Sequence, residues 1–436
     1  MKKTLLLTLV TSLVCTTPLM AVDLFITGST AFRANVHDAC AQMFTTYTEF
    51  TGTTLTGGDT KTGNGAAQWT MTGTPIAGLT AISGTLTIHA LFTGSVQGIQ
   101  TVEQSTKLLF LDATGKMMTN TPTIGFSDAS SASTPYPATG NYSEESVAVQ
   151  PFVMCKSVPV NNAVTNISNV SWEQLKYAIQ AGRIPASAWS NKSTDHTNYI
   201  YLIERTQDSG TRRCEFAQEL DGFNQSAIVY NYDSTNNVFY KATGTVAGTF
   251  GGAGIGIVGA PGNGNANLNW GPGYVGGGDI KTALGYANAA NQSIAYLSLA
   301  DAKGITGVNW SQVLPFNGVW PTAAGAGIHG NTGTNDFSPI TLGVYTCWGN
   351  EVVVYPVVDP SSISSDQNLT ASQLGDQQTT GTILGVLDSQ TKFNGGSPLP
   401  GSLENMIELS KPTGATAIRL SDMTSFRFSV GGTITP

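Results

Sequence analysis

Three of the chain's seven arginines fall in a stretch of nine residues inside the segment IERTQDSGTRRCEF, residues 203–216. Arg205, Arg212 and Arg213 surround the run Ser209-Gly210-Thr211. Apolar residues bracket this segment, a pattern that predicts the end of a strand, a tight polar turn and the first turn of a helix. Amides, hydroxyls and guanidinium groups at such a turn bind anions. The segment therefore predicts an oxyanion site.

Two structural explanations compete with anion binding at this turn. Ser209 is a preferred N-cap residue, Asp208 could serve as well, and capping is the commoner reason for such a turn. Glu204 or Asp208 could also pair with the arginines at the surface. However, Arg212 and Arg213 fall in the first helical turn, where the macrodipole disfavours each cation by roughly a few tenths of a kcal/mol. A bound anion would reverse that effect, so we favour the anion site.

Similar turns follow three other apolar stretches of the chain. They are Gly28-Ser29-Thr30, Gly94-Ser95 and Ser127-Asp128. Strands that alternate with helices predict an α/β protein with mostly parallel sheets, whose ligands lie at the carboxyl ends of the strands. Asp128 is either an ordinary turn cap or the acceptor of a proton that the ligand carries. Sulfate lacks such a proton at neutral pH.

The first 21 residues predict a secretory signal peptide. They combine a basic start, a short apolar run and a polar stretch that ends at Ala21, and the run is too short to span a membrane. We expect an exported, soluble protein in the periplasm or outside the cell. Without Lys2 and Lys3 the chain has 18 basic and 28 acidic residues, a net charge of −10. That charge argues against nucleic acid or anionic membranes as partners.

The mature length of about 415 residues suffices for two domain-sized units. Four cysteines remain after processing, and the sequence leaves all three possible pairings open. The sequence contains no CxxC spacing that would indicate a metal site, and we expect no cofactor. Gly254–Gly259 fits the pattern GxGxxG, but no helix follows it, so we interpret it as a glycine-rich loop. The cysteines are Cys40, Cys155, Cys214 and Cys347.

One further segment predicts a regular helix, and another predicts an irregular insertion. Ser171 and Gln174 form a capping box, and Val170 and Leu175 are spaced as a hydrophobic staple, so a helix is predicted after Ser171. Residues 51–80 are rich in Thr and Gly and predict a surface insertion.

With these residues identified, the chain resembles the type 2 periplasmic binding proteins, specifically the phosphate-binding proteins of ABC importers. The segments ITGSTAFRA, FTGSVQGI, IGFSDA and VSWEQLKYAIQAGRIPASAWS resemble that family in order along the chain. The best match is the arginine four residues before Ser-Gly-Thr. The ligand contacts that the resemblance implies are Ser29, Thr30, Ser95, Asp128, Arg205, Ser209, Gly210 and Thr211.

The resemblance also implies a two-lobed α/β fold with two mixed sheets flanked by helices. The chain would cross the hinge twice, with lobe 1 formed by residues 22–150 and 340–436 and lobe 2 by residues 151–339. The ligand would lie in a cleft that closes by hinge bending. The chain departs from the family in the 51–80 insertion, the glycine-rich loop at 250–278, and Ala295 in place of a glycine.

The leading hypothesis is a monomeric, non-catalytic binding protein for phosphate or a related oxyanion. An ABC permease is the partner that the resemblance implies. The first alternative is a secreted phosphatase-like hydrolase with Ser209 or Thr211 as nucleophile, which needs a metal cluster or a base that no His/Asp spacing supplies. The second is a surface or matrix protein that keeps the fold without the ligand.

Overall fold

The structure is a computed structural model. Most of the predicted signal peptide, the GxGxxG segment and Asp208 fall outside the residues that it describes. Within the described residues, no helix is long and apolar enough to span a membrane. The described residues are 21–51, 63–77, 79, 84–136, 142–157, 167–206, 209–219, 228–233, 238–241, 273–274, 276–285, 292–303, 312–323, 335–356, 416–427 and 434–435.

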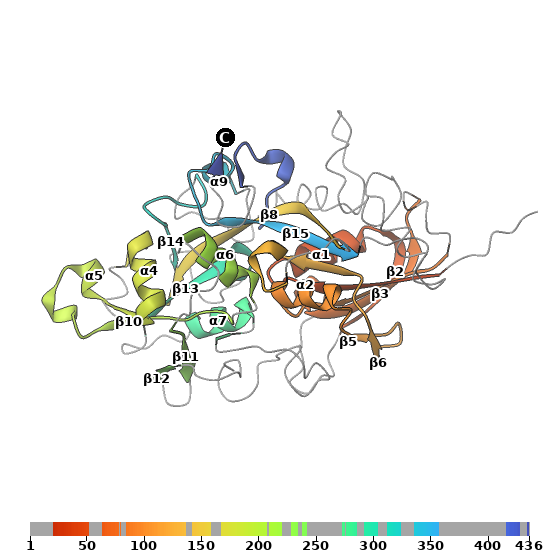
Figure 1. The fold of residues 1–436 in the computed structure, drawn as a ribbon, viewed down its shortest axis with the longest axis horizontal. Coiled ribbons are helices and arrows are strands. Elements are labelled where there is room, and N and C mark those ends of the chain that lie inside the picture. Colours follow the sequence, from red (N-terminus) through yellow and green to blue (C-terminus); the bar gives the residue numbers. More distant parts are fainter. Residues whose placement is uncertain are drawn as a thin grey trace, which may run out of the picture.

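One hydrogen-bonded path of strands runs along the long axis of the molecule (Figure 1). Its order is β2-β3-β4-β1-β7-β15-β8-β13-β10-β9, and β14 also pairs with β8. The strands are β1 (Val22–Gly28), β2 (Phe44–Thr51), β3 (Gln68–Pro75), β4 (Leu86–Leu91), β7 (Ile124–Ser127), β8 (Tyr142–Lys156), β9 (Arg183–Pro185), β10 (Tyr199–Leu202), β13 (Gln292–Ser298), β14 (Val313–Leu314) and β15 (Trp348–Pro356). Separate two-stranded pairs are β5 (Leu108–Leu111) with β6 (Met117–Asn120), β11 (Tyr230–Asp233) with β12 (Val238–Lys241), and β16 (Phe426–Arg427) with β17 (Ile434–Thr435).

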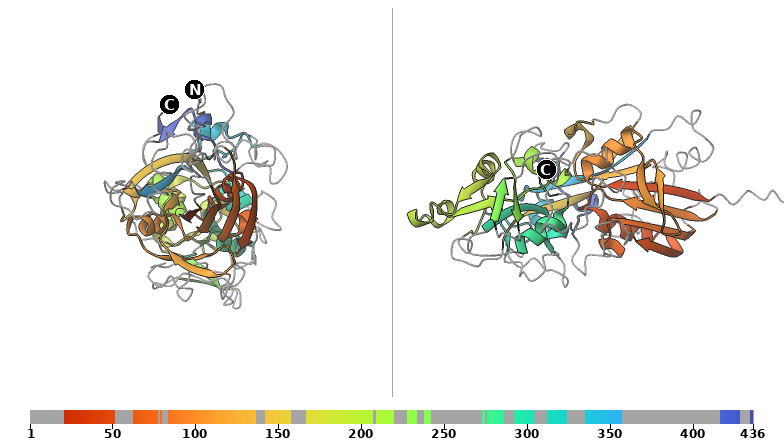
Figure 2. Two further views of the ribbon diagram at one scale, coloured as in Figure 1. Left: turned by 90° about the vertical axis from the view of Figure 1, so that its right-hand side faces the viewer. Right: turned by 90° about the horizontal axis from the view of Figure 1, so that it is seen from below.

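Strand β8 joins two halves of this sheet. Residues 142–151 pair with β15, whereas residues 152–156 pair with β13, and β14 pairs with Met154 and Cys155. We call β1, β2, β3, β4, β7 and β15, with the helices beside them, the first half, and β9, β10, β13 and β14 with theirs the second half. Figure 2 shows the two halves side by side, with β8 running from one into the other. The result is two mixed sheets that share one strand, which confirms the α/β expectation.

Parallel pairing is less common than the sequence indicated. Among the described strands it is confined to β1 with β4 and β7, and to β10 with β13. The antiparallel strands β2 and β3 extend the first half, and Trp69 and Met71 on β3 are fully buried. The expectation of a surface insertion is therefore wrong for residues 68–75. They form a strand with one buried face, although their threonines and glycines are typical of a loop.

Helices cover both halves. They are α1 (Arg33–Ala41), α2 (Ser95–Glu103), α4 (Trp172–Ala181), α5 (Ser187–Ser190), α6 (Gly210–Glu219), α7 (Gly277–Gly285), α8 (Leu299–Lys303) and α9 (Ser338–Thr341), with 3-10 turns at Gly63–Gly65, Ser131–Ser133, Ser193–Asp195 and Leu420–Asp422. The predicted capping box of α4 is confirmed in both directions, because the Gln174 amide donates to Ser171 Oγ at 3.2 Å and the Ser171 amide to Gln174 Oε1 at 2.9 Å. Val170 and Leu175 are both fully buried.

A glycine in the predicted GSVQGI motif sets how closely α2 packs on the first half. A Cβ on Gly98 would lie 2.5 Å from Gly28 Cα, a distance that real Cβ atoms do not reach. Glycine at both positions therefore lets the helix backbone lie directly against the end of β1. This close packing fixes the start of α2 beside the turn at Ser29.

Cys40, Cys155, Cys214 and Cys347 are free thiols buried in the core. Burial raises the pKa of the Cys40 and Cys155 thiols, so both stay protonated. Cys214 and Cys347 belong to the apolar cluster around the junction of the halves. The structure thus forms none of the three pairings that the sequence allowed.

Candidate functional site

The four predicted turns meet where the two halves face each other. Ser29 follows β1, Ser95 begins α2 and Asp128 follows β7, all in the first half, while Gly210 begins α6 in the second. A Cβ on Gly210 would lie 2.4 Å from Ser95 Oγ and 3.0 Å from Asp128 Cβ. The start of α6 therefore lies directly against groups of the first half.

Asp128 is the acceptor at the centre of this cluster. Its carboxylate accepts hydrogen bonds from the Ser29 hydroxyl and, at 3.1 Å, from the Thr211 hydroxyl. Its backbone amide donates to Ser95 Oγ at 3.3 Å. Asp128 is only 1% exposed, so these bonds lie away from water, where a polar group without a partner is unfavourable.

Arg205 supplies the positive charge. It is 2% exposed, and its guanidinium donates to Thr30 Oγ1 at 3.2 Å and to Thr211 Oγ1 at 3.5 Å. Burial lowers the pKa of this guanidinium, and the nearby carboxylates of Asp301 and Asp128 oppose that shift. Its hydrogen bonds reach Thr30 in one half and Thr211 in the other, so Arg205 links the two halves.

The surface pairing considered for Glu204 is wrong. Glu204 is fully buried, and its Oε1 accepts a hydrogen bond from the Arg205 backbone amide at 2.6 Å. The carboxylate therefore holds the backbone at the end of β10. This contact leaves the Arg205 guanidinium directed at the two threonines.

The capping role considered for Ser209 is confirmed. Its Oγ accepts a hydrogen bond from the Arg212 amide at 3.4 Å, and Arg212 Nη1 reaches back to the Arg205 carbonyl at 2.9 Å. The Arg212 guanidinium also lies over the Phe216 ring, 5.0 Å from its centroid. Arg212 thus stabilises the turn.

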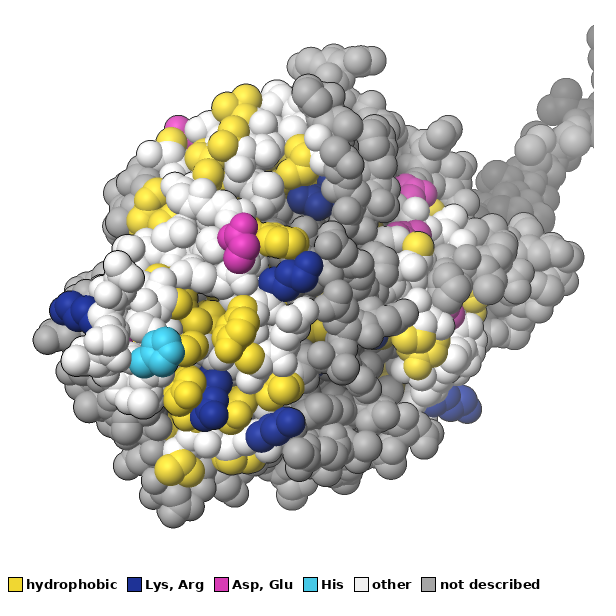
Figure 3. Space-filling model, turned by 60° about the vertical axis from the view of Figure 1, so that its left-hand side comes forward, with side chains coloured by type: hydrophobic (Ala, Val, Ile, Leu, Met, Phe, Trp, Pro, Cys, Tyr) yellow, Lys and Arg dark blue, Asp and Glu magenta, His cyan; other side chains and the backbone are white. Residues whose placement is uncertain are grey.

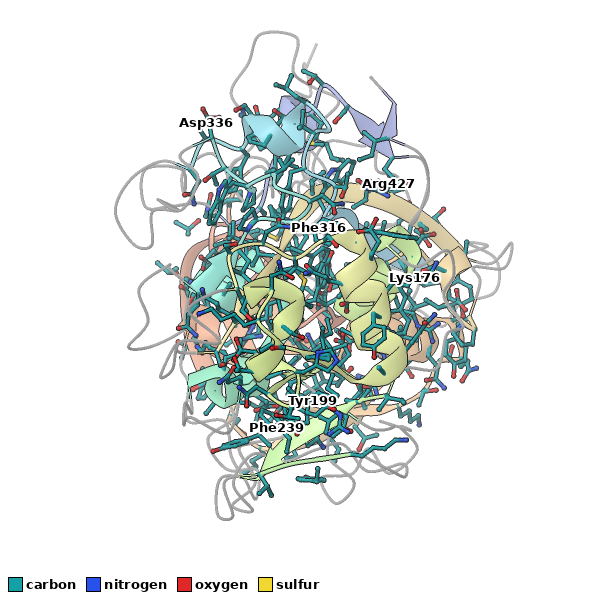
Figure 4. All side chains as sticks on the ribbon, turned by 90° about the vertical axis from the view of Figure 1, so that its left-hand side faces the viewer. Lys176, Tyr199, Phe239, Phe316, Asp336 and Arg427 are labelled. Carbon is teal, nitrogen blue, oxygen red and sulfur yellow. The ribbon has the colours of Figure 1, made fainter. Side chains whose placement is uncertain are left out.

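Two other cations of the second half, Lys176 and Arg183, are half-buried and lie over aromatic rings. Figure 3 shows lysine and arginine side chains scattered among apolar ones on the left-hand side of Figure 1. Lys176 lies 4.4 Å from the Trp172 ring centroid, and Arg183 lies 4.0 Å from that of Tyr199. Figure 4 looks onto this end and shows Lys176 on α4 and Tyr199 beneath it. These stacked cations contrast with the buried Arg205.

Several groups that contact the predicted residues were not predicted from the sequence. The Cys214 thiol donates to the Asp128 carbonyl at 2.9 Å, and a Cβ on Gly349 would lie 3.2 Å from the same oxygen. Glu351 on β15 interacts with the Asp128 carboxylate, and Asp301 with Arg205. The nearest of these in sequence, Cys214, is 86 residues from Asp128, so no local pattern could have indicated them.

The donor set suits an anion. Among the described residues, no group of three His, Cys, Asp or Glu side chains could hold a metal ion. The cluster instead combines one buried guanidinium, several hydroxyls and the starts of α2 and α6, whose amides favour negative charge. Asp128 is the buried acceptor among these donors.

No model of a protein family matches the chain, and no curated protein matches it. Solved structures do. One, described as a phosphate ABC transporter substrate-binding protein with bound phosphate from Clostridium perfringens, is 12% identical, with a TM-score of 0.41 over 91% of this chain and 99% of its own.

Two other similar structures come from different organisms. An ABC-type phosphate transport receptor from Vibrio cholerae is 13% identical, with a TM-score of 0.37 over 79% of this chain and 89% of its own. A phosphate-binding protein from Stenotrophomonas maltophilia is 13% identical, with a TM-score of 0.36 over 81% and 82%. All three have descriptions that name phosphate binding or phosphate transport.

Proposed function

We propose that this protein binds phosphate or a related protonated oxyanion between its two halves, without catalysis. The observation that carries the proposal is the position of Arg205 and Asp128. One buried cation and one buried carboxylate are both hydrogen-bonded to Thr211, and each also reaches a hydroxyl of the first half. An anion at this point would contact both halves.

The hydrogen bonds around Asp128 favour a ligand that brings its own proton. Ser29 and Thr211 each have one hydroxyl proton, and in this structure both protons go to Asp128. If these hydroxyls turned to oxygens of a bound anion, Asp128 would lose both donors. A P–OH group would supply a new one, whereas sulfate would place an acceptor against an acceptor in a buried site. Phosphate and arsenate fit this requirement at neutral pH.

A thermal-shift panel of phosphate, arsenate, sulfate and molybdate tests the proposal on the purified protein. A ligand at a hundred times its dissociation constant stabilises the folded state by about 2.7 kcal/mol. We expect phosphate and arsenate to raise the unfolding midpoint and sulfate to leave it unchanged. If no oxyanion shifts the midpoint, the fold is kept without the ligand, as in a surface or matrix protein.

We extend the proposal to the lobes and to transport. Lobe 1 (22–150 and 340–436) and lobe 2 (151–339) would close on the ligand by bending near the point where β8 changes partners. The signal-like residues 1–21 support export, and delivery to an ABC permease follows from the family resemblance. Cleavage after Ala21 in a periplasmic fraction, found by mass spectrometry of the mature N-terminus, tests the export step.

A hydrolase is the second candidate. Its nucleophile would need a base, which no sequence spacing indicated, and a carboxylate lies beside the Thr211 hydroxyl. The Thr211 hydroxyl donates to a buried carboxylate, an arrangement in which Asp128 could accept the proton of a nucleophile. Turnover of a chromogenic phosphate ester that disappears in Thr211→Val would favour this function. Absence of turnover, together with phosphate binding, would favour the binding protein.

A further inference from the structure

Glu351 is a buried acid opposite Asp128. Strand β15 pairs antiparallel with β7, with Val352 opposite Ser127, and Glu351 and Asp128 are the next residues beyond that pair on the two chains. The Asp128 carboxylate also acts on the Glu351 carboxyl group. Glu351 is 0% exposed, and neither of its carboxyl oxygens has a hydrogen-bond partner within the described structure. The backbone also shifts register between Glu351 and Val352, where β15 pairs with β8. Two carboxyl groups are thus buried side by side at the back of the proposed site.

Two further titratable groups near this pair are Cys214 on α6 and Arg427 on β16. The Cys214 thiol on α6 lies near Asp128, Glu351 and Arg427, and its burial raises its pKa, so it is neutral. Arg427 lies over the Trp348 ring, 5.1 Å from the centroid, and its Nη2 donates to the Thr346 carbonyl at 3.0 Å. Figure 4 shows Arg427 on the opposite side of this end view from Tyr199.

Two adjacent carboxylates do not both ionise easily away from water. Burial raises the pKa of Glu351 well above its usual value, and the neighbouring Asp128 raises it further. Glu351 is therefore the member of the pair that keeps a proton while Asp128 accepts from Ser29 and Thr211. A protonated Glu351 has one donor, and Asp128 is the acceptor beside it.

We propose that Glu351 is a positioning residue for the oxyanion site, which shares one proton with Asp128 so that the anion binds only while the pair holds that proton. This inference rests on the proposed function. Once the proton is lost, two carboxylates would face an incoming anion, and only Arg205 and the helix starts would oppose their repulsion. The shared proton would also hold Asp128 in the orientation that meets the proton of the ligand.

The test is the pH dependence of phosphate affinity in the full chain and in Glu351→Gln, measured by calorimetry. Glutamine keeps an N–H donor at this position and cannot ionise. In the parent we expect the dissociation constant to rise about tenfold per pH unit once the pair loses its proton. The ratio of the parent's constant to that of Glu351→Gln cancels the titration of phosphate itself, and we expect this ratio to rise with pH. A ratio that stays constant from pH 5 to pH 9 would overturn the inference.

Unfolding without phosphate tests the shared proton independently of binding. The pKa of Glu351 is raised in the folded state, so its stabilising effect is complete below the unfolded value of about 4.5 and is lost as pH rises. Glu351→Gln should therefore lose less of its unfolding midpoint between pH 5 and pH 8 than the parent loses. The matched control is Glu145→Gln on β8, whose part-exposed carboxyl accepts from Tyr355 and which should behave like the parent.

The two readouts separate the two claims. If no phosphate binds to the parent at any pH, the proposed function fails, and the unfolding comparison alone decides the shared proton. Equal pH slopes of unfolding in parent and variant would overturn it. If Glu351→Gln does not fold, Glu351→Met replaces it, since methionine has a similar volume and no charge.

Discussion

The two halves of the molecule bring opposite groups to the same point. The first half contributes hydroxyls and a carboxylate, at Ser29, Thr30, Ser95 and Asp128, whereas the second contributes the buried guanidinium of Arg205 and the start of α6. Their hydrogen bonds run from one half to the other. Neither set alone is therefore suited to a protonated anion, because one has the proton acceptor and the other the positive charge.

The halves also differ in how they fix these groups. In the first half, glycines let backbones touch, as at Gly28 and Gly98. In the second half, polar contacts hold the strand end, because Glu204 binds the Arg205 amide and Arg212 binds its carbonyl. Substitutions at Gly28 or Gly98 should therefore act through shape, and substitutions at Glu204 or Arg212 through lost polar contacts.

Removal of the Arg205 charge from the second half should weaken phosphate binding more than any other change considered below. Arg205→Ala should weaken phosphate binding by about 2–5 kcal/mol, because a buried charge pair with the anion is lost. The matched control is Arg183→Ala, whose guanidinium lies over Tyr199 at the surface and should change binding little. Calorimetric titration of both variants, after a check of folding by circular dichroism, decides the matter. Binding by Arg205→Ala as tight as the parent's would show that the site lies elsewhere.

The next largest effect is expected from a methyl group added at the contact between the halves. In Gly210→Ala the new Cβ would meet Ser95, so the halves must separate or distort, at about 1–3 kcal/mol of unfolding free energy, with weaker phosphate binding. Gly285→Ala is the control, since its Cβ would meet no atom within 4 Å. Urea denaturation measures the first effect and calorimetry the second. Unchanged binding in Gly210→Ala would mean that the ligand does not need the halves this close.

The acceptor of the first half controls selectivity. Asp128→Asn replaces an acceptor by a group that can also donate, so the preference for phosphate over sulfate should narrow by roughly 1–3 kcal/mol. Titrations of both anions into parent and variant give this difference directly. A parent that binds both anions equally would remove the role of Asp128.

The smallest effect concerns the far end of α2 in the first half. Burial raises the pKa of Glu103 to about 7, and the nearby Glu144 contributes. Stability from the protonated form is complete below about 4.5 and is lost as pH rises to about 7. Glu103→Gln should therefore flatten the decrease of the unfolding midpoint between pH 5 and pH 8 without changing phosphate affinity. An unchanged pH slope would contradict the raised pKa.

The sequence predicted the parts of the site that are local. Ser209-Gly210-Thr211 begins a helix as expected, and the turns at Ser29, Ser95 and Asp128 lie at the starts of helices or ends of strands. These predictions succeeded because caps and tight turns depend on neighbouring residues. That the eight residues bind a ligand stays a prediction.

What the sequence could not supply depends on long-range pairing. Glu351 lies opposite Asp128 only because β15 returns to pair with β7 more than two hundred residues later. A single acid in the apolar run WGNEVVVYP resembles an ordinary edge position. Trp69 was missed for a similar reason, since its strand is buried only through its pairing with β4.

Calorimetric titration of phosphate into the purified protein at neutral pH shows whether the two halves form one binding site. If the two halves jointly form one oxyanion site, phosphate should bind with one equivalent per chain, and sulfate should give no binding heat. Phosphate that gives no heat, or sulfate that binds as tightly as phosphate, would contradict the account.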